Sequence, residues 1–485
     1  MLAKYTTPQA LTRDGTTARR YAGHEMAGEF TALIMAAGHG TRMRSSLPKV
    51  LHQVCGRPMV EWVVAAAREA GAGRVVCITR PGEGVDERLA EADVEVAAQT
   101  EGEGTGSAVL AARDAIAASE TVVVLSGDHP LVAADLIRDL VDEHERASAA
   151  ATLLTTEALD PAGYGRIVRD DEGAVKRIVE TKHTEGVPEE ELAIREVNIG
   201  TYAFAADDLL GALDEVGEER GERYLTAVIP VLCERGRTLA AHRTADARSA
   251  MGVNTRADLI EIETLARRAI VERHALAGVS FTAPDTVAID ATVEIGQDTR
   301  VEAGVTLRGS TKIGDDARIG PQVTITDSQI GHDVTILHAV LVEAEVGPGA
   351  TVGPFAYLRP GARLDEGAKV GTFVEVKNST IGAGAKVPHL SYVGDADIGE
   401  GANLGASSIT ANYDGRRKHR TTVGRGVKTG IHTSLVAPVT VGEGAYTGAG
   451  SVIRKDVPDG ALAYSDAKQR NIEGYNTGSE GERPE

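Results

Sequence analysis

The amino-acid sequence predicts two folded parts: an α/β domain with a mostly parallel sheet, followed by a left-handed β-helix. Before about residue 280, short apolar runs rich in β-branched residues alternate with segments of helical periodicity, which is typical of a sheet with helices on both faces. After residue 280, aliphatic residues recur every six positions, a period that fits neither an α-helix nor a flat strand. The chain has 485 residues, too many for one ordinary hydrophobic core, so two domains are expected.

The first domain is predicted over residues 30–255 as a Rossmann-like α/β fold. Strands are expected over 30–37, 74–79, 94–99 and 121–128, and helices over 59–71 and 107–119. A stretch over 254–276 also has apolar residues at helical spacing. It predicts a helix in a connecting segment over 256–280, capped at its start by Thr255 and Asp258 in an acidic variant of the capping box.

The six-residue repeat predicts that residues 281–464 form the β-helix. A coil with three short flat sides places one aliphatic residue from each side in a central stack, which explains the period. The repeated positions are Ile289, Ile295, Val301, Leu307, Ile313, Ile319 and Ile325, and then Val352, Leu358, Leu364, Val370 and Val376. Positions four residues further on are small or β-branched: Thr299, Val305, Thr311, Ala317 and Val323. Such prisms pack side by side about a three-fold axis, so a homotrimer is expected.

Composition argues against several classes of partner. The net charge of −20 argues against a nucleic-acid-binding protein, which needs a basic face. The three cysteines, Cys55, Cys77 and Cys233, follow no metal-binding spacing and cannot form a disulfide framework, which fits a reducing cytoplasm. No apolar run is long enough to span a bilayer, so no membrane association is expected. Residues 1–29 are expected to form a mobile extension, and 465–485 a C-terminal tail.

The stretch LIMAAGHGTRM, residues 33–43, has the features of an anion-binding loop. In a parallel sheet, ligands bind beyond the carboxyl ends of the strands, and this loop follows the first strand. Its glycines let backbone N–H groups approach a base or a phosphate closely. Arg42 lies in the loop and Lys49 follows seven residues later. Two cations beside a glycine loop indicate polyphosphate handling.

Asp128, at the end of the strand predicted over 121–128, is a candidate ligand for Mg²⁺. A magnesium ion bound to phosphates takes only one or two oxygens from the protein. Asn254, in the short motif GVN, would supply the second oxygen. A lone aspartate after a strand more often forms a turn or caps a helix, so that alternative stays open.

Beyond these features, a series of motifs resembles a known family. LIMAAGHGTRM, LPKVLH, QTEGEGTGSA, GDHP, GYGRI, VE, VNIG and GVN follow, in this order, the motifs of sugar-1-phosphate nucleotidyltransferases. With PFAYLRPGA, VEVKNS, HLSYVGDADIG, ANYDG and LVAPVTVG in the repeat, the chain resembles the bifunctional bacterial family that combines N-acetylglucosamine-1-phosphate uridyltransferase with glucosamine-1-phosphate N-acetyltransferase. The resemblance covers about residues 30–475. It implies Mg²⁺ as cofactor, UTP and acetyl-CoA as co-substrates, and the two sugar phosphates as substrates.

For the first domain, the resemblance implies a nucleotide and sugar-phosphate site. It implies that Arg42 and Lys49 face the phosphates and that Asp128 and Asn254 hold Mg²⁺. The residues implied to contact the nucleotide are Met35, Ala36, Ala37, Gly38, Gln99, Gly104, Thr105 and Gly127, and those implied to line the sugar pocket are Gly165, Glu180 and Asn198. A sugar-phosphate oxygen, already anionic at pH 7, would attack the α-phosphate of UTP and expel pyrophosphate. This reaction needs alignment and charge neutralisation rather than a general base.

For the β-helix, the resemblance implies an acetyltransferase site. His389 would be the general base that takes a proton from the amine of glucosamine-1-phosphate. The residues implied to bind the sugar phosphate are Arg359, Lys377, Tyr392 and Asn403, and those implied to bind acetyl-CoA are Ala406, Asn412, Tyr413 and Ala449. The motif ANYDGRRKHR breaks the six-residue period and predicts a loop that leaves the prism. For a lone histidine, the simpler alternative is a solvated corner of the prism.

Four positions depart from the pattern of the family: Ser107, Ile199, Ile431 and Asp466. The first two would lie near the substrates of the first site. Ile431 stands where a serine is usual, and Asp466 where many members carry an arginine. Asp466 would repel the phosphates of CoA unless Lys468 or Arg470 compensates.

Three interpretations of function follow. In the leading one, the chain makes UDP-N-acetylglucosamine by acetyl transfer to glucosamine-1-phosphate and then uridylyl transfer from UTP to N-acetylglucosamine-1-phosphate. In the second, only the nucleotidyltransferase is active, and the β-helix is an oligomerisation scaffold or an inactive acetyltransferase. The third, a non-catalytic protein that binds sugars or partners, leaves Arg42, Lys49, Asp128 and His389 unexplained.

Overall fold

A computed structural model describes most of the chain, namely residues 29–38, 40–179, 187–219, 221–246, 248, 251–465, 468–473 and 475. The chain divides into two compact units. The first consists of Met1–Val54 and Pro58–Ile262, and the second of Cys55–Arg57 and Glu263–Glu485. The extension predicted over 1–29 lies outside the described residues apart from Glu29.

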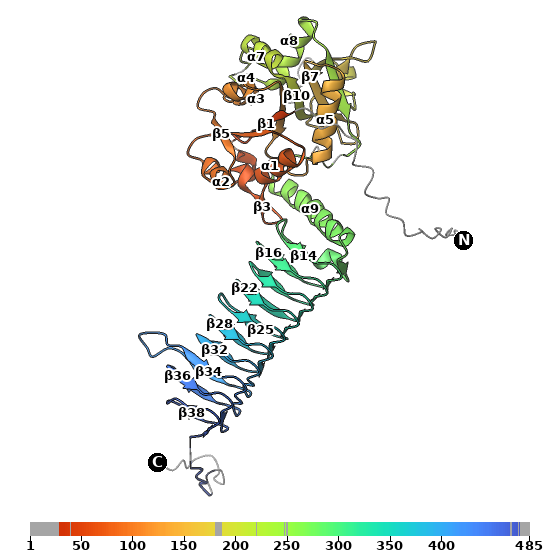
Figure 1. Ribbon diagram of the computed structural model, residues 1–485. Coiled ribbons are helices and arrows are strands. Elements are labelled where there is room, and N and C mark those ends of the chain that lie inside the picture. The colour runs from red at the N-terminus through yellow and green to blue at the C-terminus, as the bar shows by residue number, and fades with distance from the viewer. Residues whose placement is uncertain are drawn as a thin grey trace, which may run out of the picture. The chain divides into compact units, whose positions relative to one another are not determined.

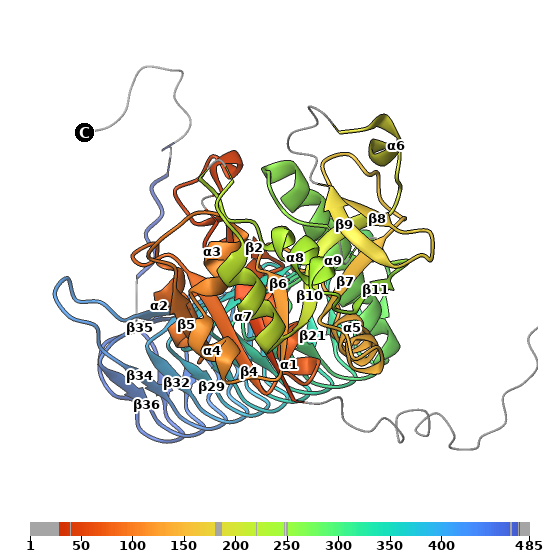
Figure 2. The same cartoon turned by 90° about the horizontal axis from the view of Figure 1, so that it is seen from above.

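A mostly parallel sheet forms the centre of the first unit (Figure 1). Its strands are β1 (Phe30–Met35), β4 (Arg74–Thr79), β5 (Glu95–Ala98), β6 (Thr121–Ser126), β7 (Ala151–Thr156), β8 (Arg166–Arg169), β9 (Val175–Val179), β10 (Val197–Ala205) and β11 (Leu239–Arg243). The main order is β11-β7-β10-β6-β1-β4-β5, and the hairpin of β8 and β9 joins it through β10 (Figure 2). Strands β6, β1, β4 and β5 are parallel, whereas β10 runs antiparallel to β6 and β7. A separate short ribbon pairs β2 (Gln53–Val54) with β3 (Arg57–Pro58).

Helices cover both faces of this sheet (Figures 1 and 2). The helices that cover it are α1 (Met59–Glu69), α2 (Val85–Glu91), α3 (Thr105–Leu110), α4 (Arg113–Ala117), α5 (Ala134–Arg146), α7 (Ala206–Glu215) and α8 (Val228–Glu234). The short α6 (Glu189–Leu192) buries none of its residues. On β1, Ala32 and Ile34 belong to a buried cluster with α1, α2 and α5, whereas Leu33 belongs to a second cluster with α3, α4, α7 and α8. Because both faces are buried, the strand is apolar almost throughout, and its carboxyl end stays open for a site.

The strands and helices predicted from the first part are present, with one difference. The helix expected over 107–119 is two shorter helices, α3 and α4. At Ala112 the backbone has φ −98° and ψ 22°, which lies outside the α-helical region and interrupts the helix. The predicted strand boundaries agree with β1, β4, β5 and β6 to within two residues.

The helix α9 (Arg256–Leu276) begins with the predicted capping box. The Thr255 hydroxyl accepts a hydrogen bond from the backbone N–H of Asp258 at 3.2 Å, and the Asp258 carboxylate accepts bonds from the backbone N–H groups of Thr255 and Asn254 at 2.9 Å. Burial opposes ionisation of Asp258, but these hydrogen bonds outweigh it and lower its pKa. The cap therefore also fixes the backbone of Asn254.

The second unit is the predicted β-helix, in which parallel strands of successive coils form three sheets (Figure 1). The first sheet has β12 (Ser280–Phe281), β15 (Arg300–Val301), β18 (Arg318–Ile319), β21 (Thr335–Ile336), β24 (Thr351–Val352), β27 (Lys369–Thr372) and β30 (Lys386–His389). The second has β13 (Ala288–Ile289), β16 (Thr306–Arg308), β19 (Thr324–Thr326), β22 (Ala339–Val342), β25 (Ala356–Leu358), β28 (Glu375–Lys377), β31 (Tyr392–Gly394), β33 (Ile409–Ala411), β35 (Ser434–Val436) and β38 (Val452–Ile453). The third has β14 (Glu294–Ile295), β17 (Lys312–Ile313), β20 (Gln329–Ile330), β23 (Glu345–Val346), β26 (Arg363–Leu364), β29 (Thr380–Ile381), β32 (Ala396–Ile398), β34 (Thr421–Val423) and β36 (Val439–Val441). A final pair joins β37 (Tyr446–Thr447) and β39 (Leu462–Ala463).

The aliphatic repeat fills the interior of the β-helix, as predicted. Leu307, Ile319 and Ile325 have no exposed side-chain surface, and the same holds for Leu358 and Val370 after the phase resumes. Ile295, in the first coil, is the half-buried exception among the repeated aliphatic positions. Each coil thus buries one aliphatic residue per side, and this burial stabilises the prism. Over the part of the chain that the structure describes, no helix combines the length and the apolar character needed to cross a bilayer.

His274, near the end of α9, is expected to make the second unit sensitive to acid. Its side chain is buried, and among the described residues its Nε2 has no hydrogen-bond partner. Burial, with the nearby Arg273 charge, lowers the pKa of His274 from 6.5 to about 4. The unfolded chain therefore binds more protons between these pH values, and stability falls as the pH falls through this window.

Urea unfolding at pH 7 and pH 4 tests this prediction. We expect wild type to lose about 3 kcal/mol more unfolding free energy between the two pH values than His274→Leu, which removes the titrating group. An equal loss in both proteins would contradict a role for His274.

Candidate functional site

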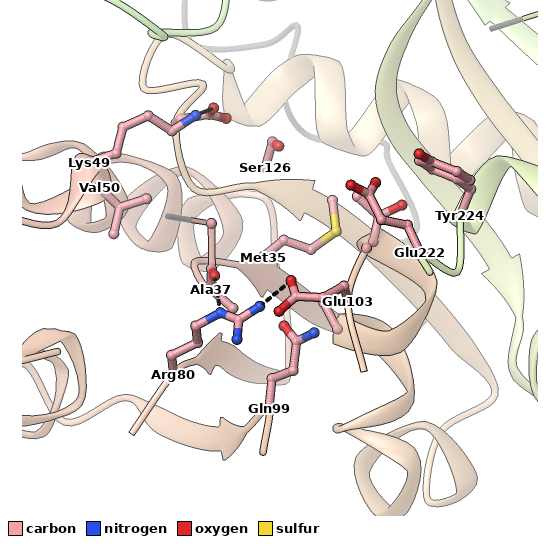
Figure 3. A pocket seen from close by; sticks show the side chains of 15 residues that line it. Met35, Ala37, Lys49, Val50, Arg80, Gln99, Glu103, Ser126, Glu222 and Tyr224 are labelled. Atoms are coloured by element: carbon pink, nitrogen blue, oxygen red, sulfur yellow. Dashed lines mark hydrogen bonds and ion pairs between the residues drawn. The ribbon is translucent and has the colours of Figure 1, made fainter. Parts of the chain in front are cut away.

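A cavity of about 380 Å³ opens at the carboxyl ends of β1, β4, β5 and β6, the edge that the sequence predicts for a nucleotide (Figure 3). Its lining residues are Met35, Ala37, Gly38, Lys49, Val50, Arg80, Gln99, Glu103, Gly104, Thr105, Ala108, Ser126, Asp128, Glu222 and Tyr224. The nucleotide-contacting residues implied by the resemblance are thus largely brought together. Two of them, Ala36 and Gly127, are not part of this lining, and both are held by backbone hydrogen bonds, to Ile78 and Met35.

Two cationic and two oxygen-bearing side chains form a cluster, which includes Lys49 and Asp128 of the cavity lining. Lys49 Nζ donates to Asp128 Oδ2 and lies 3.3 Å from Asn254 Oδ1. The same Asn254 oxygen accepts a hydrogen bond from Arg42 Nη2 at 2.8 Å. Residues from three distant segments therefore form one cluster, as expected from their positions at the sheet edge and at the start of α9. The backbone N–H of Val253 bonds to the carbonyl of Asp128 at 3.0 Å and holds two of these segments together.

Asp128 is ionised in this cluster. Burial opposes its ionisation, but the charges of His129 and Lys49 and hydrogen bonds from Lys49 and Ser126 lower the pKa of its carboxyl. Burial also lowers the pKa of His129, whose Nε2 lies 3.7 Å from Asp128 Oδ1. Oδ1 of Asp128 is buried, and it has no hydrogen-bond partner among the residues described. A buried carboxylate oxygen of this kind is suited to accept one more positively charged group.

The sugar-pocket residues lie along β8 and β10. The backbone N–H of Asn198 bonds to the Gly165 carbonyl at 2.9 Å, and its side-chain amide donates to Tyr202 Oη at 2.6 Å. Gly165 and Asn198 are therefore together, but neither belongs to the lining of the 380 Å³ cavity. Glu180 lies outside the described residues. Ile199 is buried in the cluster of α1, α2 and α5, so this departure from the family pattern alters the core of the unit.

Several lining residues were not predicted from the sequence. Arg80 directly follows β4, and the strand-end rule could have identified it. Glu222 and Tyr224 come from a segment without a periodic signal, which docks onto the glycine loop after β5. The backbone N–H of Arg223 bonds to the Glu103 carbonyl at 2.9 Å. A Cβ at Gly104 would lie 2.5 Å from the Arg223 carbonyl oxygen, so this close approach requires glycine.

On the β-helix, the proposed base and two of the proposed CoA-binding residues, Ala406 and Ala449, occupy one row of corners. Backbone hydrogen bonds join each corner to the next coil: Ser407 N–H to His389 O, His432 N–H to Ala406 O, and Gly450 N–H to Ile431 O. His389, Ala406, Ile431 and Ala449 therefore hold equivalent positions on successive coils, spaced by about 4.8 Å per coil. Ile431 belongs to this row, and its side chain is 52% exposed. The departure at Ile431 thus places an apolar side chain between two proposed CoA contacts.

The sugar-phosphate residues lie on adjacent coils. Arg359 follows β25, Lys377 ends β28 and Tyr392 begins β31, and these strands are neighbours in one sheet. The Arg359 guanidinium pairs with Glu375 at 2.8 Å. Asn403 lies on a different side of the prism, where its backbone bridges those of Lys386 and Lys428. The fold thus places Arg359, Lys377 and Tyr392 on one side of the prism and Asn403 on another side.

The motif ANYDGRRKHR forms a loop that leaves the stacked coils, as predicted (Figure 1). Asn412, at its base, donates to Asp395 Oδ2 at 2.5 Å, whereas Tyr413 is exposed. Near the end of the loop, Lys418 returns beside Lys377, whose proximity lowers the pKa of Lys418. Two adjacent ammonium groups beside Arg359 and Tyr392 favour an anion. Lys418 was not predicted, because a loop has no period from which to place it.

The C-terminal tail contains the residues expected to face the phosphates of CoA. Asp466 lies outside the described residues, and Lys468 and Arg470 are exposed.

Ser107, the other departure from the family pattern in the first unit, is half-buried next to Gly102. A Cβ at Gly102 would lie 2.7 Å from the Ser107 hydroxyl.

Comparison with known proteins relates both units to transferases. Residues 32–238 match the MobA-like NTP transferase domain, and residues 292–327 match the bacterial transferase hexapeptide (six repeats). The bifunctional protein GlmU of Streptomyces avermitilis is 48% identical over 451 residues, covering 91% of this chain and 93% of that protein. The bifunctional proteins GlmU of Enterococcus faecalis and Mycobacterium tuberculosis are 45% and 47% identical, each over 92% of this chain and over 97% and 92% of their own lengths. The chain therefore belongs to the family of bifunctional GlmU proteins, the family that its motifs resemble.

Proposed function

We propose that the chain makes UDP-N-acetylglucosamine by two transfer reactions at two separate sites. As a member of the GlmU family it is a bifunctional transferase with nucleotidyltransferase and acetyltransferase activities, and its substrates include UTP, acetyl-CoA and sugar phosphates. The cluster of Arg42, Lys49, Asp128 and Asn254 at the edge of a parallel sheet is the observation that supports the uridyl-transfer site best. Since UTP and acetyl-CoA are intracellular co-substrates, the proposed location is the cytoplasm.

In the first site, the protein aligns two anions. The backbone of Ala37 and Gly38 and the side chain of Gln99 line the cavity where the uridine would bind. Arg42 and Lys49 would then face the phosphates and offset their charge. A phosphate oxygen of N-acetylglucosamine-1-phosphate attacks the α-phosphorus of UTP, the P–O bond to the β-phosphate breaks, and pyrophosphate leaves. The number of protons is unchanged, which explains why no base is needed.

The residues present fit a magnesium ion. Asp128 and Asn254 offer a carboxylate and an amide oxygen, the ligand type that Mg²⁺ prefers. The buried Oδ1 of Asp128 has no hydrogen-bond partner within the described ranges, and His129 Nε2 lies 3.7 Å from it. Lys49 Nζ already faces both residues, so a positive charge is stable at this place. When bound, Mg²⁺ would neutralise charge on the phosphates. Asp128 and Asn254 would hold it, and Lys49 and Arg42, which now donate to these two residues, would then turn to the phosphates of the substrates.

In the second site, His389 acts as the base. The exposed His389 imidazole takes a proton from the amine of glucosamine-1-phosphate as the amine nitrogen attacks the thioester carbonyl. The C–S bond breaks, and the CoA thiolate leaves and takes up a proton. Arg359, Lys377 and Lys418 would bind the sugar phosphate through their positive charges. The row from Ala406 to Ala449 would lie along the bound CoA.

Two separate assays on the full-length protein test this function. Glucosamine-1-phosphate with acetyl-CoA should release CoA thiol, and N-acetylglucosamine-1-phosphate with UTP and Mg²⁺ should release pyrophosphate. Failure of the first assay alone would leave a nucleotidyltransferase with a scaffold. Chelation of Mg²⁺ is expected to stop only the second reaction.

We also propose that the β-helix forms a homotrimer through a ladder of exposed side chains, defined as His338, Phe355, Phe373 and Leu390. The Phe355 and Phe373 rings stack at 5.3 Å with an angle of 11° between their planes, and the His338 ring lies 5.3 Å from Phe355. Phe355 and Phe373 are 55% and 58% exposed. Stacked rings open to solvent are typical of an interface. Two further copies of the chain would cover the ladder about a three-fold axis.

Sedimentation at micromolar concentration should give a trimer for wild type. Replacing both Phe355 and Phe373 by lysine should convert it to monomers, because charge repulsion and lost apolar burial oppose association. The matched control is Leu276→Lys, which changes an exposed leucine at the end of α9 and should remain a trimer. A monomeric wild type would overturn the proposal.

A further inference from the structure

Arg80 joins the two loops that form one end of the nucleotide cavity. Its Nε donates to the carbonyl oxygen of Ala37 at 2.9 Å, and its Nη2 donates to Glu103 Oε2 at 2.6 Å. In Figure 3 its side chain lies between these two residues, on the side of the cavity next to Gln99. Ala37 follows β1 and Glu103 follows β5, so Arg80 spans the loops of both neighbours of its own strand, β4.

The position of Arg80 explains why a side chain is needed here. Backbone pairing on either side of β4 ends with Ala36 N–H to Ile78 O and Gln99 N–H to Thr79 O, both at 2.8 Å. Beyond these bonds, the Arg80 guanidinium connects the two loops through its bonds to Ala37 and Glu103. Its planar fork suits two acceptors in different directions, which a lysine ammonium matches less well. The Arg80 side chain is only 20% exposed, whereas Glu103 is 52% exposed, so the arginine is the more fixed partner.

The two loops joined by Arg80 carry the groups that would read the base. One loop provides the backbone of Ala37 and Gly38. The other provides Gly104 and Thr105 next to Gln99, whose side-chain amide nitrogen already donates to the Gly102 carbonyl at 3.0 Å. That bond fixes the orientation of the Gln99 amide, whose oxygen can accept a bond from the base, such as the uracil N3–H. Discrimination then depends on the distance between the two loops.

We propose that Arg80 is a positioning residue that sets uracil selectivity by holding these two loops at a fixed separation. The inference rests on the proposed uridyl transfer and adds a residue to it. Arg80 acts on the base end of the cavity, away from the cluster of Lys49 and Asp128 where the phosphates would react. Its loss should therefore weaken nucleotide binding and base discrimination more than the chemical step.

A purely electrostatic role for Arg80 makes a different prediction. The Glu103 carboxylate lines the same cavity and would repel the phosphates of UTP if Arg80 did not offset its charge. In that case, removing the carboxylate as well would restore binding. The double variant Arg80→Gln/Glu103→Gln therefore separates a connection between the loops from the neutralisation of one charge.

The experiment measures uridyl transfer with UTP and with CTP at saturating N-acetylglucosamine-1-phosphate and Mg²⁺, in wild type and in four variants. We expect Arg80→Gln to raise KM for UTP about tenfold and to lower the ratio of kcat/KM for UTP over CTP about tenfold. Its kcat should stay within about threefold. Arg80→Lys should recover part of the loss, and the double variant should recover none. Titration calorimetry should show the same tenfold weaker UTP binding.

Arg88→Gln is the matched control. Arg88 lies on α2, forms ion pairs with Glu61 of α1 and Glu91 of α2, and is outside the cavity lining. It should leave all these values unchanged. An unchanged UTP/CTP ratio in Arg80→Gln, a fall in kcat alone, or full recovery in the double variant would overturn the inference. If wild type itself releases no pyrophosphate from UTP, the proposed function fails instead, so the two failures are distinguishable.

Discussion

Replacing Asp128 by alanine is expected to abolish pyrophosphate release, by at least about a thousandfold, and to leave CoA thiol release at the wild-type rate. The change removes the carboxylate proposed to hold Mg²⁺ and leaves the Lys49 ammonium without the anion that it contacts. Both reactions are measured in the same preparation, with N-acetylglucosamine-1-phosphate and UTP for the first and glucosamine-1-phosphate and acetyl-CoA for the second.

Asp135→Ala provides the control for this variant. Asp135 is an exposed aspartate in the first turn of α5 that pairs with Arg138, outside the lining of the cavity. Its replacement should change neither reaction. A loss of both activities to the same extent in Asp128→Ala would contradict two independent sites.

Replacing His389 by alanine is expected to lower acetyl transfer by roughly a hundredfold to ten-thousandfold, the usual contribution of a positioned base. Affinity for acetyl-CoA should change little, because the proposed contacts of Ala406 and Ala449 with CoA remain. Since His389 is exposed at a corner of the prism, its loss leaves the buried aliphatic stack intact. Thiol release gives the rate, and titration calorimetry gives the affinity for acetyl-CoA.

His332→Ala is the corresponding control, because His332 is also an exposed histidine of the β-helix but lies several coils before the proposed site. It should leave acetyl transfer unchanged. Pyrophosphate release should be normal in both variants. A His389→Ala protein that transfers acetyl groups at the wild-type rate would assign the base to another residue.

The β-helix could be predicted in detail because its period has one structural solution. An aliphatic residue every six positions must be buried in a three-sided coil, and Val301, Leu307 and Ile319 are indeed in its interior. The aligned row of His389, Ala406, Ile431 and Ala449 could not be read in the same way. Residues 412–420 leave the prism between two of these coils, so the intervals along the sequence are unequal. Only backbone pairing therefore shows the alignment.

The first site was predictable where strand ends carry its residues. Lys49 and Asp128 are 79 positions apart, and the rule for parallel sheets is enough to place them at one edge. Glu222 and Tyr224 could not be predicted, because they reach the cavity from a segment defined only by its contacts with the glycine loop. The motif around Ile199 could not show which way its side chain points, and the structure buries that side chain in the core.

The central claim, that two independent sites act in sequence, is tested most directly by mixing the two inactive variants. Asp128→Ala alone should stop at N-acetylglucosamine-1-phosphate, and His389→Ala alone should not use glucosamine-1-phosphate. Mixed with glucosamine-1-phosphate, acetyl-CoA, UTP and Mg²⁺, the two proteins should together produce UDP-N-acetylglucosamine, because the intermediate can pass from one protein to the other. A mixture that releases CoA thiol but forms no UDP-N-acetylglucosamine, although His389→Ala uses supplied N-acetylglucosamine-1-phosphate, would contradict it.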